Sequence, residues 1–349
     1  KFFIIILTYL FFLSGVSAET FTSALKKAYT NNPELNAERE SLNISEQDLK
    51  ISKSSYLPTV TLSGSKSEQE TDKLTNRDGS SASITNVDPS VQSITITQTL
   101  IDFCRGAEFK KSKIGIKLAK TKLLKKEQDI IYKSIEAYTG LISDREKLKI
   151  NKSNVNLLER QVETDRIRLE RGNISLSDVA QSESSLAGAQ AKFIQAENDF
   201  LTSKLNYENV IGKLNDTELL DKSSIIEIRL PIELSSAIEL SKKNNPDLII
   251  AQLEHEQSKK DTSSARSDLA PSATLSFDRS KTDDLNATYD EKEQDTLKAT
   301  VSWPFYSGGK NYANLKKSKS LELQKNLLLE NMTKKNQTDV ASAWSNYLS

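Results

Sequence analysis

The sequence predicts a mainly helical protein that also carries four β-strands, built as two copies of one helix–strand–strand–long helix unit. Residues 20–67 reappear without a gap as residues 233–280, most clearly where Asn31-Asn32-Pro33-Glu34-Leu35 matches Asn244-Asn245-Pro246-Asp247-Leu248. A long duplication of this kind implies two equivalent halves of one architecture. Each half contains stretches with alternating apolar and polar residues, which indicate strands, and long stretches without proline, which indicate helices.

The first eighteen residues predict a secretory signal peptide. Lys1 precedes an apolar run from Phe2 to Leu13, and small residues follow up to Ala18. This order is typical of a signal that is cleaved before Glu19, and the apolar run is shorter than the roughly 20 residues of a membrane-spanning helix.

The composition favours long, thin packing over one large core. The chain has 36% hydrophobic and 28% charged residues, with only 11 Gly and 7 Pro in 349 positions. Its 48 basic and 48 acidic residues balance, so no nucleic acid partner is expected. Cys104 is the single cysteine and cannot form an intrachain disulfide.

Helices open each half, and strands follow them. In the first half we expect a helix at about 20–30, a break at Asn31-Asn32-Pro33, and a second helix up to Tyr56 that Pro58 ends. Alternation then predicts β-hairpins at about 59–100 and 272–303, with the polar stretches 68–90 and 279–295 as exposed loops.

Each predicted strand has one apolar and one polar face. The apolar faces carry Val60, Leu62, Ile94, Ile96, Leu275, Phe277, Leu297, Val301 and Trp303. The polar faces carry Thr61, Ser63, Thr95, Thr97, Thr274, Ser276, Lys298 and Thr300. Two interpretations fit this pattern: small sheets on a soluble core, or a membrane barrel with lipid on one face and water on the other. Four strands cannot close a barrel and open edges are not tolerated in lipid, so a barrel requires several chains.

A long helical hairpin is predicted at about 106–214. Residues 106–171 contain no proline and would form a helix of roughly 100 Å at 1.5 Å per residue. The returning segment has a heptad repeat, typical of a coiled-coil seam, at Val179, Leu186, Phe193, Phe200, Tyr207 and Leu214.

The turn between these two helices is a candidate docking point. Gly172 can end the first helix, and Ser175 or Ser177 can cap the second. We expect the tip to expose Ile174 and Leu176. The proposed tip residues are Arg171, Gly172, Asn173, Ile174, Ser175, Leu176, Ser177 and Asp178.

Taken in order, these motifs resemble the TolC-like outer membrane efflux proteins. The residues that carry the resemblance are the paired Asn-Pro-x-Leu helices at 32–35 and 245–248, Leu57-Pro58 before a strand, Leu100-Ile101-Asp102-Phe103, and Trp303-Pro304-Phe305-Tyr306-Ser307-Gly308-Gly309. The resemblance implies a homotrimer in which three chains supply twelve strands to one outer-membrane barrel, continued by an α-helical coiled-coil barrel in the periplasm. It also implies that the apolar strand faces contact outer membrane lipid and that the tip meets the periplasmic adaptor of an inner-membrane pump. Export of small molecules or of proteins would be the function.

The duplication also predicts the domain organisation. The first structural repeat is expected at 19–232 and the second at 233–349, where only the start of the second long helix is present. Compared with the first half, the second is expected to be C-terminally truncated. Since the missing part would contain the tunnel constriction of the family, no gate residues are assigned.

No catalytic, cofactor-binding or metal-binding residues are expected, so the chain is predicted not to be an enzyme. His255 is the only histidine, which excludes multi-histidine metal sites and a Ser-His-Asp triad, and it is interpreted as a solvated residue. Cys104 has no second cysteine beside it. The alternative function is a soluble periplasmic helical-hairpin adaptor or a coiled-coil scaffold, which would explain the helical hairpin but not the four strands.

Overall fold

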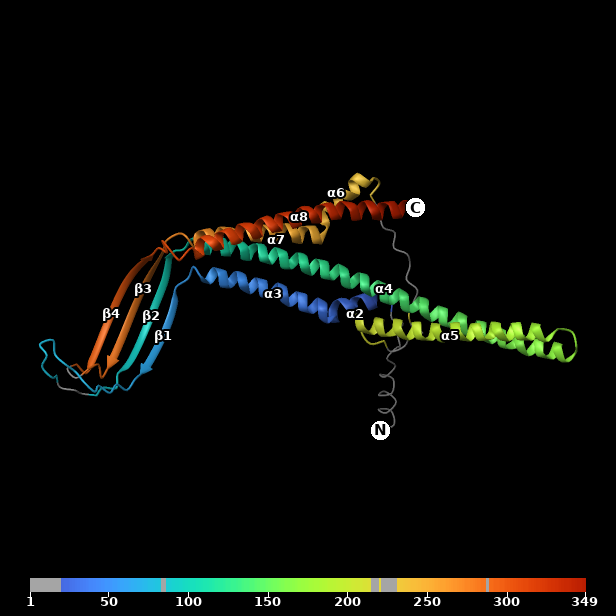
Figure 1. Cartoon of the computed structure of the whole chain (residues 1–349), viewed down its shortest axis with the longest axis horizontal. Helices are drawn as coiled ribbons and strands as arrows, with labels where there is room; N and C mark the ends of the chain where they lie inside the picture. Colours follow the sequence, from blue (N-terminus) through green and yellow to red (C-terminus); the bar gives the residue numbers. More distant parts are fainter. Residues whose placement is uncertain (1–19, 83–85, 215–219, 221–230, 287–288) are drawn as a thin grey trace, which may run out of the picture. The chain divides into compact units, whose positions relative to one another are not determined.

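A computed structural model describes residues 20–82, 86–214, 220, 231–286 and 289–349 (Figure 1). The predicted signal peptide lies outside these residues. The elements follow in the order α2 (Phe21–Asn31), α3 (Pro33–Ser54), β1 (Thr59–Lys66), β2 (Ser90–Ile101), α4 (Phe103–Glu170), α5 (Leu176–Val210), α6 (Leu234–Asn244), α7 (Pro246–Ser267), β3 (Ser272–Asp283), β4 (Glu291–Ser302) and α8 (Lys310–Leu348). The predicted fold class, mainly helical with four strands per chain, is confirmed, and the four strands form a single sheet.

The two halves use elements of matching length. Helices α2 and α6 have 11 residues each, and α3 and α7 have 22 residues each. Two strands and a long helix follow in both halves, and the long helix α4 has 68 residues. Among the described helices, none combines the length and the apolar character needed to cross a membrane.

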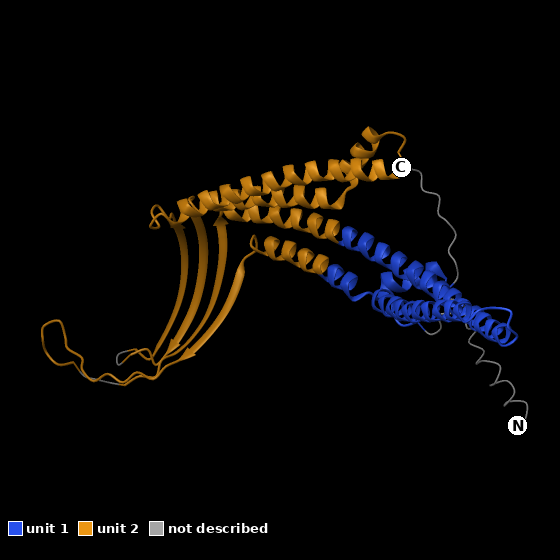
Figure 2. Cartoon of the chain, turned by 45° about the vertical axis from the view of Figure 1, so that its right-hand side comes forward, with its two compact units in different colours: residues 1–40, 123–230 blue, residues 41–122, 231–349 orange. Residues whose placement is uncertain are grey.

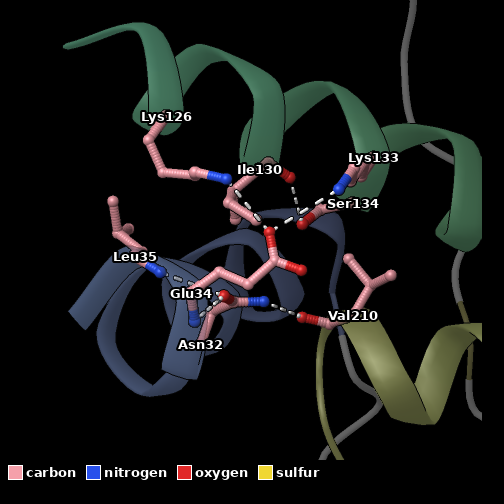
Figure 3. A network of polar contacts seen from close by, with 8 residues as sticks. All are labelled: Asn32, Glu34, Leu35, Lys126, Ile130, Lys133, Ser134 and Val210. Carbon is pink, nitrogen blue, oxygen red and sulfur yellow. Dashed lines mark hydrogen bonds and ion pairs between the residues drawn. The ribbon is translucent and has the colours of Figure 1, made fainter. Parts of the chain in front are cut away.

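The repeated Asn-Asn-Pro motif acts as a helix cap. The Asn32 side chain accepts hydrogen bonds from the N–H groups of Glu34 and Leu35, at 2.9 and 3.2 Å, and donates to the carbonyl of Val210 at 3.0 Å (Figure 3). Asn245 repeats the first contact with the N–H of Asp247 at 2.9 Å. Because the following proline has no N–H to satisfy, an asparagine cap before it completes the helix start.

A glutamate next to this cap joins α3 to α4. Glu34 lies 3.2 Å from the Nζ of Lys126 and 3.7 Å from that of Lys133 (Figure 3). The hydrogen bond from Lys126 and the charge of Lys133 lower the pKa of Glu34. In the same view, the buried Ser134 hydroxyl donates to the carbonyl of Ile130 at 2.7 Å, which satisfies the hydroxyl within its own helix.

Contacts divide the chain into two compact units that cut across the repeats (Figure 2). The first unit contains residues 1–40 and 123–230, and its core is centred on the fully buried Tyr138 and Tyr207. The ring of Tyr138 meets that of Phe21 edge to face, with centroids 5.3 Å apart.

Helices α4 and α5 pack along the predicted heptad seam within this first unit. The buried residues of α5 are Val179, Ser182, Ala189, Ala196 and Tyr207. Several of them are small, which allows the two helices to approach closely. Arg166 and Glu183 form an ion pair between the helices at 2.6 Å.

The second unit contains residues 41–122 and 231–349, which include the sheet and the helix pair α7 and α8. Lys325 of α8 contacts Glu254 of α7 at 2.7 Å, and the Asn245 cap also donates to the buried Asn336 of α8 at 2.5 Å. Gly308 and Gly309 have positive φ angles of 63° and 82°, which allow the chain to turn from β4 into α8.

Arg105 ties the sheet to the helices in the second unit. Its guanidinium donates to the carbonyls of Ser55 and Thr99, both at 3.1 Å, and of Leu100 at 3.2 Å. It also lies 4.8 Å from the ring centroid of Tyr56. The end of α3, the end of β2 and the start of α4 are therefore held by one buried side chain.

Candidate functional site: the four-stranded sheet and the helical tip

The four strands form one antiparallel sheet in the order β1-β2-β3-β4. Directly paired residues lie on the same face of a sheet, so the register decides which side chains share a surface. Val60 pairs with Ile96, Ile96 with Phe277, and Phe277 with Leu297. This row of four apolar residues crosses the whole sheet.

The register gathers the predicted apolar side chains on one face. Leu62 pairs with Ile94 beside the Val60 row, and Leu275 pairs with Ala299 on its other side. On the edge strands, Val60, Leu62 and Leu297 are 64–76% exposed. On the inner strands, Ile94, Ile96 and Phe277 are 37–42% exposed, and Leu275 is half-buried. Exposed apolar patches of this kind mark an interaction surface. We call it the apolar face.

The opposite face carries the hydroxyl side chains that the sequence grouped together. Thr61 pairs with Thr95, Thr97 with Ser276, and Thr274 with Thr300, while Ser63 and Lys298 lie on the same side. Asp278 joins this polar face and accepts a hydrogen bond from the Thr95 hydroxyl at 2.7 Å. The two faces therefore differ sharply in their affinity for water.

The second hairpin is longer than the sequence predicted. The stretch 279–295 was expected to be an exposed loop, which is wrong, since β3 reaches Asp283 and β4 begins at Glu291. In residues 279–283 and 291–295 both faces of the strands carry polar side chains, so the sequence shows no alternation of apolar and polar residues. Ion pairs across the strands connect Arg279 to Asp295 at 3.8 Å and Lys281 to Glu291 at 2.9 Å.

Aromatic residues gather at the opposite end of the sheet, after β4. Trp303 lies one residue beyond the strand, where its Nε1 donates to the carbonyl of Leu269 at 3.1 Å. Its ring meets Phe305 at 5.7 Å between centroids, and both Phe305 and Tyr306 are more than 80% exposed. Such aromatic groups are enriched where membrane barrels meet the interface, and Phe305 and Tyr306 were missed as site residues because they follow the strand.

Strands β1 and β4 are the two edges of the sheet. An edge strand presents unpaired backbone N–H and C=O groups and is a template for pairing with another chain. Both edges are thus the part of this sheet where a second chain can add.

The tip of the α4–α5 hairpin is a tightly closed turn. Gly172, with φ of 73°, donates to Leu169 at 2.8 Å, and Asn173 donates to Arg168 at 2.9 Å. These two bonds close the end of α4 in the Schellman pattern, for which the left-handed glycine is needed. Ser175 then begins α5.

Ser175, rather than Ser177, is the cap of α5. Its side chain accepts from the N–H of Asp178 at 3.3 Å, and its own N–H donates to the Asp178 carboxylate at 2.9 Å. The Asp178 carboxylate accepts hydrogen bonds from the Ser175 N–H and, at 2.8 Å, from the Ser175 hydroxyl, and these two bonds hold the pKa of Asp178 below its ordinary value of 3.8. Leu176 is 72% exposed, whereas Ile174 is half-buried, so only one of the two expected apolar residues projects freely. Arg171 and Ser177 are exposed.

Neither Cys104 nor His255 forms a reactive site. Burial raises the pKa of the Cys104 thiol to about 11, and the thiol contacts Asp268 at 3.2 Å. His255 was expected to be solvated, but it is half-buried, and its Nδ1 has no hydrogen-bond partner among the described residues. Within the same residues, no group of three or more His, Cys, Asp or Glu side chains could hold a metal ion.

Comparison with known families identifies this arrangement. The family model described as "Outer membrane efflux protein" matches residues 24–213 and 237–349, which covers most of the chain. The chain belongs to the outer membrane efflux protein family.

Curated relatives and solved structures agree with this membership. The chain is 26% identical over 337 residues to the outer membrane efflux protein BepC of Brucella suis, spanning 95% of this chain and 71% of the relative. It is 22% identical to the alkaline protease secretion protein AprF of Pseudomonas aeruginosa, spanning 88% and 66%. In structure it is similar to the Campylobacter jejuni CmeC outer membrane channel, with a TM-score of 0.76, 17% identity, and coverage of 89% and 67%.

Family membership places the chain in the outer membrane, with its helical part in the periplasm. The predicted resemblance and transport function are confirmed. The alternative, a soluble periplasmic adaptor or scaffold, is not supported, because the matching proteins are outer membrane efflux and secretion proteins.

Proposed function

We propose that three copies of the chain join their sheets edge to edge into one outer-membrane barrel that serves as a passive exit duct. The observation that carries this proposal is a sheet with two open edges, one exposed apolar face and one hydroxyl-rich face. Lipid offers no hydrogen-bond partners, so both edges must be paired with other strands for the sheet to reside there. A single sheet of four strands satisfies this requirement only by adding copies of itself.

The two faces then have distinct surroundings. The apolar face contacts lipid, and the polar face lines a water-filled lumen. Trp303, Phe305 and Tyr306 anchor the periplasmic rim, since aromatic side chains favour the membrane interface. The Arg279–Asp295 ion pair continues the row of Leu62 and Ile94, and the Lys281–Glu291 ion pair lies nearer the loop end of the strands.

The helical tip connects the duct to its energy source. We infer that the turn from Arg171 to Asp178 docks the periplasmic adaptor of an inner-membrane pump. Relatives are named for efflux in one case and for protease secretion in two others, so the exported cargo is a small molecule or a protein. The chain itself carries no catalytic activity, and the inner-membrane pump supplies the energy for export.

A charge placed on either face tests the barrel. Leu297→Lys puts an ammonium on the apolar face, where the cost is up to about 2–4 kcal/mol at midplane depth. Thr300→Lys is the matched control, because it adds the same charge to the polar face, beside the natural Lys298. We expect heat-dissociable trimers in outer-membrane fractions for Thr300→Lys and a loss of them for Leu297→Lys. Equal trimer yields for the two variants would contradict the assignment of faces.

Crosslinking tests the docking tip. In a Cys104→Ser background, a cysteine at Asn173 carries a photoactivatable crosslinker, and a cysteine at the exposed Leu157 of α4 serves as the control. Covalent capture of a periplasmic adaptor at Asn173 and not at Leu157 supports docking by the tip. Capture at Leu157 alone would place the adaptor along the helices instead.

A further inference from the structure

The two edge strands of the sheet, β1 and β4, allow only a few registers in which two copies can pair. We propose that β4 of one copy pairs with β1 of the next in a single register, with Val60 opposite Val301, Gly64 opposite Leu297, and Lys66 opposite Asp295. This inference rests on the proposed ring of copies and specifies the backbone pairing that closes it.

The hydrogen-bond pattern shows which residues face the open edge of β1. Beyond the strand end, Gln69 and Val87 exchange both backbone hydrogen bonds, and Ser67 donates to Pro89 at 3.0 Å. In an antiparallel ladder such pairs alternate along the strand. The odd-numbered residues of β1 therefore bond to β2, and the N–H and C=O groups of Val60, Leu62 and Gly64 point to the free edge.

The rows across the sheet limit the possible registers. The row that starts at Val60 ends at Leu297 on β4. In the next copy, Leu297 pairs with Val60 itself or with a residue displaced from it along β1. The displacement must be an even number, since an odd one would turn the next sheet's apolar face into the lumen.

The tilt of barrel strands selects among the even displacements. Strands rise about 3.4 Å per residue and lie about 4.8 Å apart, so a displacement of two, four or six residues over four strands tilts them by about 20°, 35° or 47°. Closed barrels have tilts of about 35–45°. Four residues is the displacement that fits, and it brings Leu297 opposite Gly64.

The lengths of the strands decide in which direction along β1 the displacement runs. Displacement toward Lys66 places the whole of β1, Thr59–Lys66, opposite residues 295–302 of β4. Displacement by four residues the other way would bring Leu297 opposite Tyr56, which precedes β1, and would leave half of β1 without a partner. An unpaired edge within the bilayer is costly.

The side chains agree with this register. Val60 meets Val301 and Leu62 meets Ala299 on the apolar face, while Thr61 meets Thr300 on the polar face. Lys66 lies opposite Asp295, which is already 3.8 Å from Arg279 of its own sheet. A displacement of six would instead set Lys66 against Leu297. The strand tilt thus excludes a displacement of two residues. The contact of the charged Lys66 with Leu297 disfavours a displacement of six.

Engineered disulfides test the register in the full chain with Cys104→Ser. Thr61→Cys with Thr300→Cys forms a non-hydrogen-bonded pair, whose Cα atoms lie about 4.5 Å apart. The matched controls combine Thr61→Cys with Lys298→Cys or with Ser302→Cys, which correspond to displacements of two and six. In the proposed register their Cα atoms are about 8 Å from that of Thr61, beyond the roughly 7 Å limit for a disulfide.

Oxidised outer membranes, analysed on non-reducing gels, give the result. We expect most of the Thr61/Thr300 double variant to run as covalent oligomers that reductant dissolves, and both controls to stay monomeric. Stronger linkage in either control would overturn the register while leaving the ring intact. If none of the three pairs links chains that have reached the outer membrane, the edges do not join, and the proposed barrel fails together with the register.

Discussion

The buried guanidinium of Arg105 is the junction between sheet and helices, and its removal should loosen that junction. Arg105 is 8% exposed and donates three hydrogen bonds to backbone carbonyls. Bonds from a charged donor contribute about 1.5 kcal/mol each, and the contact with the Tyr56 ring about 0.5–1 kcal/mol. The Nε atom is buried without a partner among the described residues, and the cost of removing it from water offsets roughly 1–2 kcal/mol of this stabilisation. Arg105→Met should therefore cost about 3–4.5 kcal/mol.

Thermal unfolding of the purified protein in detergent measures this cost. The matched control is Arg166→Met, because Arg166 forms an exposed ion pair with Glu183, and such pairs contribute at most about 1 kcal/mol. We expect the midpoint to fall by about 5 °C or more for Arg105→Met and by about 2 °C or less for Arg166→Met. Arg105→Lys should lie between, since lysine keeps the charge but not the planar fork. An Arg105→Met midpoint no lower than that of Arg166→Met would refute the role of this side chain.

Three further predictions follow from local contacts. Asn32→Ala should cost about 1–2 kcal/mol in thermal unfolding, because it removes the cap of α3 and the link to Val210, whereas Asn31→Ala should be nearly neutral. Acid should loosen the tip, since a carboxyl whose folded pKa lies below its ordinary value stabilises the fold above that value and loses the effect as pH falls through the folded pKa. The protection of the amides at residues 172–178, measured as the ratio of the intrinsic to the observed exchange rate at each pH, should therefore fall at low pH in the parent chain and much less in Asp178→Asn. Cys104, with a thiol pKa of about 11, should be alkylated at pH 8 one to two orders of magnitude more slowly in the folded protein than in urea, and equal rates would contradict its burial.

Much of the fold follows from local patterns in the chain. The duplication predicted paired helices before paired strands, and α2, α3, α6 and α7 have those positions. Strict alternation located β1 and β2, because a strand with one apolar face has a period of two. The heptad repeat that runs from Val179 to Tyr207 located the seam of α5, because apolar residues seven positions apart lie along one side of a helix.

The predictions failed where the local signal is ambiguous. Residues 279–283 and 291–295 are polar on both faces, so their charges suggested a loop, although Arg279 and Lys281 pair with acidic residues on the neighbouring strand. Ser175 and Ser177 are equally good caps by residue type, and only the geometry of the turn assigns the cap to Ser175. Ile174 was expected to be exposed, but the turn folds it partly inward.

The period of each element, the amphipathic faces and the break at each Asn-Asn-Pro could be predicted from the sequence, because these features depend on neighbours within a few positions. The fold was needed to show which residues share a row, which strand edges stay open, and that Arg105 and Asn32 hold distant segments together. Those facts depend on pairing between residues far apart in the chain, and no local pattern records a register. The row from Val60 to Leu297, from which the joining of two copies follows, is a property of the sheet and of none of its strands alone.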